Sequence, residues 1–190
     1  MSKMEKEGNV LFATSNKHKF FEASQTLKSQ NIDIEHFEFQ YNEIRSESIE
    51  EIAKDAVEEA FRRVQKPVFV EDSGLFISVL NGFPGTYSAW VNKKIGPGGI
   101  LKLLEKIPRR AATFETCIAY SDGENTKIFK GNCAGTISKE ILGKEGFGYD
   151  PIFIPEGFSE TFAQSIGLKN KLSHRYKALL EFSKYLNRVK

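Results

Sequence analysis

The chain has no apolar run long enough to cross a membrane, and residues 1–8 are polar and of mixed charge, unlike a signal peptide. Its two cysteines, Cys117 and Cys133, fit no metal-binding spacing, which favours free, buried thiols in a cytosolic protein. A net charge of +2 is too small to indicate a nucleic-acid-binding protein. Internal repeats and low-complexity linkers are also absent. These absences predict a cytoplasmic protein that binds neither nucleic acid nor membranes, with a flexible extension at 1–8 and one domain at 9–190.

What the chain does contain is enough apolar material for a substantial core, because 40% of its 190 residues are hydrophobic and sixteen are Phe. Apolar runs bounded by turn residues predict strands, and apolar residues spaced three and four apart predict helices. The predicted strands are 9–13, 68–71, 111–120, 126–137 and 152–154, and the predicted helices are 17–29, 48–65, 100–106 and 174–188. The sum is a mixed α/β domain with long antiparallel strands in the middle.

Residues typical of helix ends and turns support several of these predicted elements. Ser48 followed by Glu51 resembles a capping box at the start of the helix 48–65, and Pro67 ends that segment. Asp122-Gly123 between the two long strands predicts a hairpin. Ser173 is well placed to cap the last helix.

The stretch from Pro67 to Gly74 is the most informative for function. An apolar, β-branched run is followed directly by the carboxylates Glu71 and Asp72, and then by Ser73. We expect the strand to end there, and strand ends in α/β folds are common ligand sites. Two carboxylates are costly to bury unless a cation or another partner compensates them. A solvated turn after the strand is the alternative interpretation.

The segment from Thr14 to Lys19 joins the first strand to the first helix. Free backbone N–H groups and the helix dipole favour a phosphate at such a helix start. The side chains of Thr14, Ser15, Asn16, Lys17, His18 and Lys19 add hydroxyl, amide and charged donors. The glycine spacing of a Walker A loop is absent. The alternative is a capped surface helix with ordinary lysines.

A third group of residues is acidic. Glu43, Glu71 and Asp72 could converge to hold one or two Mg²⁺ ions, since Mg²⁺ takes a few carboxylates and leaves its other positions to water and substrate phosphate. A carboxylate among them could also orient a water nucleophile. Lys54 lies near the edge of the apolar stripe of the helix 48–65, and on position alone a solvated lysine is the simpler interpretation.

Two later segments could contact a flat ligand. Phe147-Gly148-Tyr149-Asp150 offers aromatic faces on a glycine-rich loop, although such aromatics more often pack into a core. Lys169 and the pair His174-Arg175 could recognise carbonyl or phosphate oxygens, although an exposed helix start is the simpler interpretation.

The order of these motifs closely resembles the inosine triphosphate pyrophosphatase (Ham1-like) family. The resemblance rests on Thr14 to Lys19, Glu43, Val70 to Leu75, Asn81 to Ser88, Phe147 to Pro151 and Ser173 to Arg175, and it spans nearly everything from Val10 to the last helix. It implies a two-lobed α/β fold with a long central mixed sheet flanked by helices, and a cleft between the lobes. It also implies a homodimer and Mg²⁺-dependent hydrolysis of ITP, dITP and XTP to the monophosphate and pyrophosphate.

The resemblance also implies a role for each motif. Thr14, Ser15, Asn16, Lys17, His18 and Lys19 would grip the phosphates, with Lys54 assisting. Glu43, Glu71 and Asp72 would place the metal, Asp72 would be the general base, and Ser73 would contribute at the same turn. The base and sugar would lie on Phe147, Gly148, Tyr149 and Asp150, and Lys169, His174 and Arg175 would close on the purine.

Four residues depart from the family pattern: Ser15 where glycine is usual, Arg45-Ser46 where Gln-Gly is usual, and Tyr149 where tryptophan is frequent. None of them removes a charge that the chemistry needs. Two rival readings stay open at this point. One is a Maf-like pyrophosphatase of pyrimidine nucleotides, and the other is a nucleotide-sensing or RNA-binding module without turnover.

Overall fold

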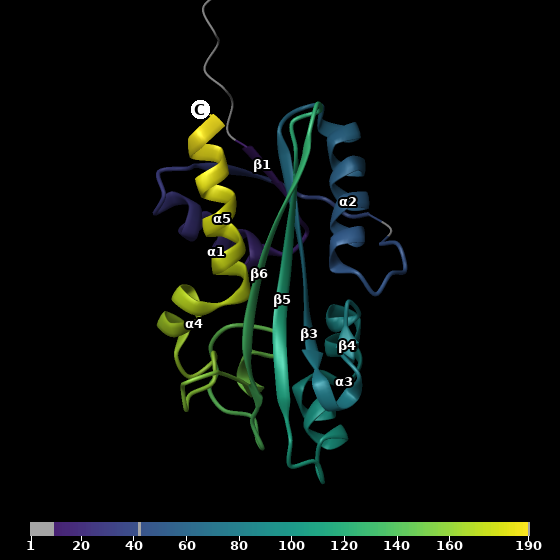
Figure 1. Cartoon of the computed structure of the whole chain (residues 1–190), viewed down its shortest axis with the longest axis vertical. Helices are drawn as coiled ribbons and strands as arrows, with labels where there is room; N and C mark the ends of the chain where they lie inside the picture. Colours follow the sequence, from purple (N-terminus) through teal and green to yellow (C-terminus); the bar gives the residue numbers. More distant parts are fainter. Residues whose placement is uncertain (1–9, 42, 190) are drawn as a thin grey trace, which may run out of the picture.

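The computed structural model describes residues 10–41 and 43–189 (Figure 1), so the extension predicted at 1–8 lies outside the described residues. A seven-stranded mixed sheet has the order β2-β1-β3-β5-β6-β7, with β4 paired to β3. Its strands are β1 (Val10–Ala13), β2 (Ile34–Phe37), β3 (Val68–Ile77), β4 (Pro84–Gly85), β5 (Ala111–Ser121), β6 (Thr126–Ile137) and β7 (Phe153–Pro155). The helices are α1 (Lys17–Lys28), α2 (Ile49–Val64), α3 (Ser88–Leu103), α4 (Ile166–Leu172) and α5 (His174–Val189), with short 3-10 turns η1 (Ser78–Leu80) and η2 (Asp150–Ile152). The predicted α/β class, a long mixed sheet flanked by helices, is confirmed.

The helices lie on both faces of the sheet, and three apolar cores hold them there. In Figure 1, α1 and α5 lie on one side of the long strands and α2 lies on the other, while α3 and β4 lie toward the opposite end. One core joins α1 and α5 to the sheet through residues such as Phe69 and Phe182, and a second lies under α2 around Val57. A third core, around Phe114, gathers α3, β7 and the loops at the other end. The two ends of the sheet are thus the two predicted lobes.

Local signals in the sequence explain the ends of the helices. The Ser48 hydroxyl accepts the Glu51 N–H at 3.3 Å and caps α2, and Gln65 ends that helix in the left-handed conformation. The Glu51 carboxylate instead accepts the Ser46 hydroxyl, so only half of the predicted capping box forms. Ser173 caps α5 as predicted, because its hydroxyl accepts the Tyr176 N–H at 3.2 Å.

The prediction that β3 ends at Glu71 is wrong. The strand continues to Ile77, because β5 pairs with all ten of its residues in an unbroken antiparallel ladder. Asp72, Ser73 and Gly74 are poor strand formers, but long-range pairing outweighs local propensity. The two carboxylates therefore lie in the middle of a strand, where successive side chains point to opposite faces.

The structure also differs from the sequence prediction in three shorter or irregular elements, α3, β2 and α4. The helix predicted at 100–106 is the second part of α3, which already begins at Ser88 and is interrupted by the positive φ of Gly96. The strand β2 and the helix α4 were not predicted. Cys117 and Cys133 are free and buried, as expected. In the part of the chain that the structure describes, no helix is long and apolar enough to span a membrane.

Candidate active site

The candidate site occupies a gap at one edge of β3. On this edge β1 pairs with Val68 and Phe69, and β4 pairs with Leu75 and Phe76, so the described strands leave 70–74 unpaired between them. The other edge is covered throughout by β5. A pocket of about 410 Å³ opens at the gap, and side chains from both faces of β3 line it. Such an interruption exposes backbone groups as well as side chains to a ligand.

Side chains already satisfy part of this open edge. Lys19 Nζ donates to the Glu71 carbonyl at 3.0 Å, and Ser88 Oγ accepts the Leu75 N–H at 2.8 Å. Gly74 is required at the end of the gap, since a Cβ there would lie 2.4 Å from the Gly85 carbonyl oxygen. These contacts fix the N-terminus of α1 and the start of α3 at opposite ends of the gap.

The first turn of α1 lies at the end of the gap nearest β1. Asn16 caps the helix by accepting the N–H groups of His18 and Lys19 at 2.9 and 3.2 Å, and Thr14 Oγ1 accepts the Asn16 N–H. Ser15 is exposed at the turn. Because the positive end of the helix dipole and Lys19 lie together here, this end of the pocket favours an anion.

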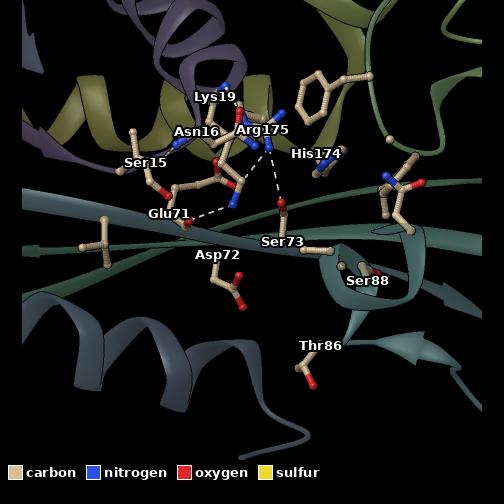
Figure 2. A pocket seen from close by; sticks show the side chains of 18 of the residues that line it. Ser15, Asn16, Lys19, Glu71, Asp72, Ser73, Thr86, Ser88, His174 and Arg175 are labelled. Atoms are coloured by element: carbon tan, nitrogen blue, oxygen red, sulfur yellow. Dashed lines mark hydrogen bonds and ion pairs between the residues drawn. The ribbon is translucent and has the colours of Figure 1, made fainter. Parts of the chain in front are cut away.

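Glu71 lies on the α1 and α5 face of β3 (Figure 2), where Arg175 binds it. Arg175 Nε donates to one Glu71 oxygen at 2.8 Å and a second guanidinium nitrogen donates to the other at 3.3 Å. Thr116 also donates to Glu71, and Lys19 lies 3.7 Å away. Burial alone would raise the pKa of Glu71, but Arg175 and Lys19 outweigh it and lower the pKa to about 2. Glu71 is therefore an ionised, fully partnered carboxylate.

The network continues through Glu22 on α1. Its carboxylate accepts Arg175 at 2.7 Å and Lys169 at 2.6 Å, and Lys169 also donates to Asp150 at 2.7 Å. Lys169 and Arg175 are only 1% and 2% exposed. Asp150 in turn accepts the Phe147 N–H, and Lys169 Nζ lies 4.2 Å from the centre of the Phe147 ring. Buried charges of both signs thus tie α1, α4, α5 and the 147–150 loop together.

Asp72 lies on the opposite face of β3, in a different environment (Figure 2). Its Oδ2 atom is buried and has no hydrogen-bond partner among the described residues. Burial raises the pKa of Asp72 to about 6, with Glu71 and Glu43 adding to the shift and Lys19 opposing it. Burial and the same carboxylates also raise the pKa of Tyr41, so its phenol is neutral. Asp72 is thus able to change protonation state near neutral pH.

The end of the pocket nearest α3 is mostly aromatic. The His174 ring stacks on Phe114, with centroids 4.5 Å apart, and burial and the neighbouring Arg175 keep the pKa of His174 well below its usual value. Tyr149 is buried in the core and donates its hydroxyl to the Ser88 carbonyl at 3.1 Å. Two buried polar atoms here, His174 Nδ1 and Asn92 Oδ1, have no partner within the described ranges.

The structure gathers most of the predicted site residues around one pocket. Those that line it are Thr14, Ser15, Asn16, Lys19, Glu43, Glu71, Asp72, Ser73, Phe147, Gly148, Tyr149, Asp150, Lys169, His174 and Arg175. Lys17 and His18 are exposed on α1, where His18 stacks on Phe147. Lys54 is exposed on α2, pairs with Glu50 and is not among the residues that line the pocket.

Sequence reasoning missed Glu22, Tyr41, Ser88 and Asn92. Glu22 follows Lys19 by three residues, so helical spacing could have placed both on one face of α1. Ser88 and Asn92 share a face of α3 in the same way, but this part of the helix was not predicted. No local signal identifies Tyr41.

Comparison with known proteins agrees with this arrangement. The model of the Ham1 family matches residues 10–185. The chain belongs to the Ham1 family. It is similar to a protein from Methanopyrus kandleri named dITP/XTP pyrophosphatase, with 49% identity over 95% of this chain and 97% of the relative. A protein of the same name from Saccharolobus solfataricus is 45% identical over 91% of each chain. The Ham1 protein structure from Staphylococcus aureus superposes with a TM-score of 0.80 at 30% identity, covering 95% of this chain and all of that one.

In this Ham1 family member, the part of the pocket beside Asp72 and Glu43 has acceptors that suit a divalent cation. Asp72 Oδ2 is a buried acceptor without a partner among the described residues, and Glu43 lines the same pocket. Both Glu71 oxygens are already taken by Arg175. Within the described ranges, no three acidic, histidine or cysteine side chains form a metal cluster. Proteins nevertheless often bind Mg²⁺ with only one or two carboxylates, and water and substrate phosphate supply its other ligands.

Proposed function

We propose that this protein hydrolyses the triphosphates of deaminated purines, ITP, dITP and XTP, to the monophosphate and pyrophosphate. The observation that carries the proposal is the position of Asp72. Its Oδ2 atom is buried without a hydrogen-bond partner among the described residues, and it lines a pocket that also contains the start of α1 and an aromatic compartment. The names of the relatives, dITP/XTP pyrophosphatase, support the same reaction.

The triphosphate binds at the end nearest β1. The exposed Ser15 side chain offers a hydroxyl donor to a phosphate oxygen, the positive end of the α1 dipole faces the same turn, and Lys19 supplies a positive charge. The N–H groups of His18 and Lys19 are already donated to Asn16. Asn16 holds this turn through its side-chain oxygen, which caps the helix, and its side-chain NH2 group is the part that can donate to a phosphate oxygen. Asp72 lines the same pocket, so a triphosphate bound in this way would extend toward it.

Mg²⁺ fits the remaining acceptors of the site and would be held by Asp72 and Glu43. When bound, it neutralises charge on the triphosphate and so stabilises the charge that develops as the α–β anhydride bond breaks. Glu71 contributes by holding Arg175 in place, since its own oxygens are occupied.

Asp72 is the general base of the proposed reaction. Its pKa of about 6 leaves it ionised at neutral pH and still basic enough to accept a proton from the attacking water. The water oxygen adds to phosphorus, the α–β bond breaks, and pyrophosphate leaves with the electron pair. Among the described residues, no donor is hydrogen-bonded to Asp72 Oδ2.

The purine lies at the aromatic end. Arg175 donates four hydrogen bonds to Glu71, Glu22 and Ser73, and within the described residues this leaves one of its five N–H donors for a ligand oxygen. A 6-oxo group accepts such a donor, whereas the 6-amino group of adenine does not. Lys169 and Asp150 stabilise Phe147 at the mouth of this compartment.

The test is pyrophosphate and phosphate release from ITP, dITP, XTP, ATP and GTP, with and without Mg²⁺. We expect Mg²⁺-dependent pyrophosphate release from the first three and little from ATP and GTP. Single phosphate release would contradict the proposed scissile bond. Turnover of pyrimidine triphosphates alone would favour the Maf-like reading, and nucleotide binding without turnover would favour a sensor.

A homodimer in the cytoplasm completes the proposal. The two buried, free thiols suit a reducing compartment. Exposed apolar side chains on and before α3, among them Tyr87 and Trp90, supply surface that a second copy could cover. Light scattering on a sizing column tests the dimer, and a mass of one chain would contradict it.

A further inference from the structure

Asn92 presents an unusual atom to the pocket. Its Oδ1 atom is fully buried and accepts no hydrogen bond from the described residues, although the residue lines the same pocket as Asp72. An unsatisfied buried acceptor is destabilising, so a folded protein keeps one where a bound water, ion or ligand satisfies it, and an acceptor that belongs to a pocket lining can be satisfied by the ligand of that pocket. This position is not explained by packing alone.

The place of Asn92 in the fold identifies the part of a ligand that it meets. Asn92 lies one turn after Ser88 on α3, and Ser88 binds β3 at Leu75. The phosphate end is fixed at Glu71 by Lys19. Leu75 lies four positions after Glu71, which corresponds to about 13 Å along β3. Asn92 is therefore at the base end of a nucleotide whose phosphates lie on α1.

Three other residues that line this end of the pocket do not donate a hydrogen bond to Asn92 Oδ1 in the described structure. Phe114 presents an aromatic ring, and the Tyr149 hydroxyl is already donated to the Ser88 carbonyl. His174 is neutral and its Nδ1 atom has no partner within the described residues. A donor on the ligand is thus the partner that Asn92 Oδ1 lacks.

We propose that Asn92 is a specificity-determining residue whose side-chain oxygen accepts the N1–H of a 6-oxopurine. The inference rests on the proposed function and adds a second contact beside the 6-oxo group. Hypoxanthine and xanthine carry a proton on N1, whereas adenine has a bare acceptor there. With adenine bound, two acceptors would face each other and both would stay unsatisfied.

Such a mismatch is a strong source of selectivity. A site built to pair with a ligand N–H rejects an analogue that lacks it far more strongly than an apolar pocket rejects a small change in shape. Asn92 thereby discriminates on N1, and the free Arg175 donor discriminates on position 6. The contact does not separate guanine from hypoxanthine, because both carry the N1 proton.

The test compares base selectivity in the wild type, Asn92→Leu and Asn92→Ala. We expect the ratio of kcat/KM for ITP over ATP to fall about tenfold or more in both variants, mainly through KM for ITP. The matched control is Lys93→Ala, an exposed neighbour on the same helix, which should leave the ratio unchanged. An unchanged ratio in correctly folded Asn92 variants would overturn the proposal.

A binding measurement separates this inference from the reaction itself. Calorimetry without metal gives the dissociation constants of IMP, 1-methyl-IMP and AMP. Wild-type protein should bind IMP about tenfold or more tightly than 1-methyl-IMP, and Asn92→Ala, which leaves room for the methyl group, should bind the two equally. Equal binding by the wild type refutes the Asn92 contact. Selective IMP binding without pyrophosphate release from any purine triphosphate instead refutes the proposed function and leaves the contact standing.

Discussion

The two faces of β3 at the gap differ in how their charges are satisfied. On the α1 and α5 face, Glu71 and Arg175 belong to a buried network in which each charged group has a partner of opposite sign. On the other face, one strand residue away, Asp72 keeps a buried oxygen without a partner in the described structure. The comparison separates two uses of buried charge. A satisfied network fixes geometry, whereas an unsatisfied group remains free to react.

The largest effect should come from the unsatisfied face. Asp72→Asn keeps the shape of the side chain but removes the base, so kcat with ITP should fall by roughly 10²–10⁴. The same change relieves a buried charge, so the free energy of unfolding at pH 7.5 should rise by about 1–3 kcal/mol. Steady-state kinetics and urea denaturation measure the two effects.

The matched control is Asp33→Asn, which neutralises an exposed carboxylate remote from the pocket. It should change neither turnover nor stability appreciably. Near-normal turnover by Asp72→Asn would show that Asp72 is not the general base. The unsatisfied oxygen on its face of β3 would then have no role in catalysis.

The satisfied face should respond in stability. Glu71→Ala leaves Arg175 with an incomplete set of partners in the protein interior, and we expect a loss of about 3–5 kcal/mol in the free energy of unfolding. The double variant Glu71→Ala/Arg175→Met should recover part of it, because no unpaired charge remains. Urea denaturation of both variants tests this.

An exposed pair provides the control for that measurement. Glu59 binds Arg63 one turn away on the surface of α2, and Glu59→Ala should cost less than about 1 kcal/mol. Equal losses for Glu59→Ala and Glu71→Ala would show that the buried network does not fix the site.

The pH dependence should distinguish the two carboxylates. Because the pKa of Asp72 is about 6, kcat/KM should fall about tenfold per pH unit below pH 6. Its folded pKa exceeds the unfolded value, so protonation of Asp72 increases stability as the pH falls through 6. The pKa of Glu71 is about 2, so its stabilising contribution is lost only below about pH 4.5. Activity should therefore fail between pH 6 and 5 while the melting temperature holds. A parallel loss of both would contradict the assignment.

The smallest effect should come from a lysine outside both faces. Lys54 is exposed and paired with Glu50, so Lys54→Ala should change kcat/KM less than about twofold. Lys19→Ala, at the phosphate end, should raise KM for ITP at least tenfold. A large effect of Lys54→Ala would mean that α2 approaches the bound triphosphate.

Local signals in the sequence were sufficient for several elements. Ser48 and the apolar stripe of 49–64 located α2, and Asp122-Gly123 located the hairpin of β5 and β6. These signals act within a few residues, where capping and turn chemistry decide the conformation. The order of the motifs also led to a correct prediction that most of the site residues lie around one pocket.

Long-range contacts explain what local signals missed. The strand β3 runs on through Asp72 and Gly74 because β5 pairs with it, although neither residue favours strands. Because β3 continues through Asp72, the side chains of Glu71 and Asp72 point to opposite faces of the sheet and lie in different environments. A turn at this point would not separate them in this way. Glu22 gains its role from side chains about 150 positions later, which no local pattern contains.

This separation along the chain also fixes when the site can form during synthesis. Glu22 meets Lys169 and Arg175 across 147 and 153 positions. A ribosome-bound chain that ends before residue 169 contains Glu22, Glu71 and Asp72 but neither cation of the network. Closing such long loops is slow and comes late in folding. We therefore expect the nascent protein to stay inactive until α4 and α5 have left the ribosome, because residues 166–189 carry the two cations that complete the pocket.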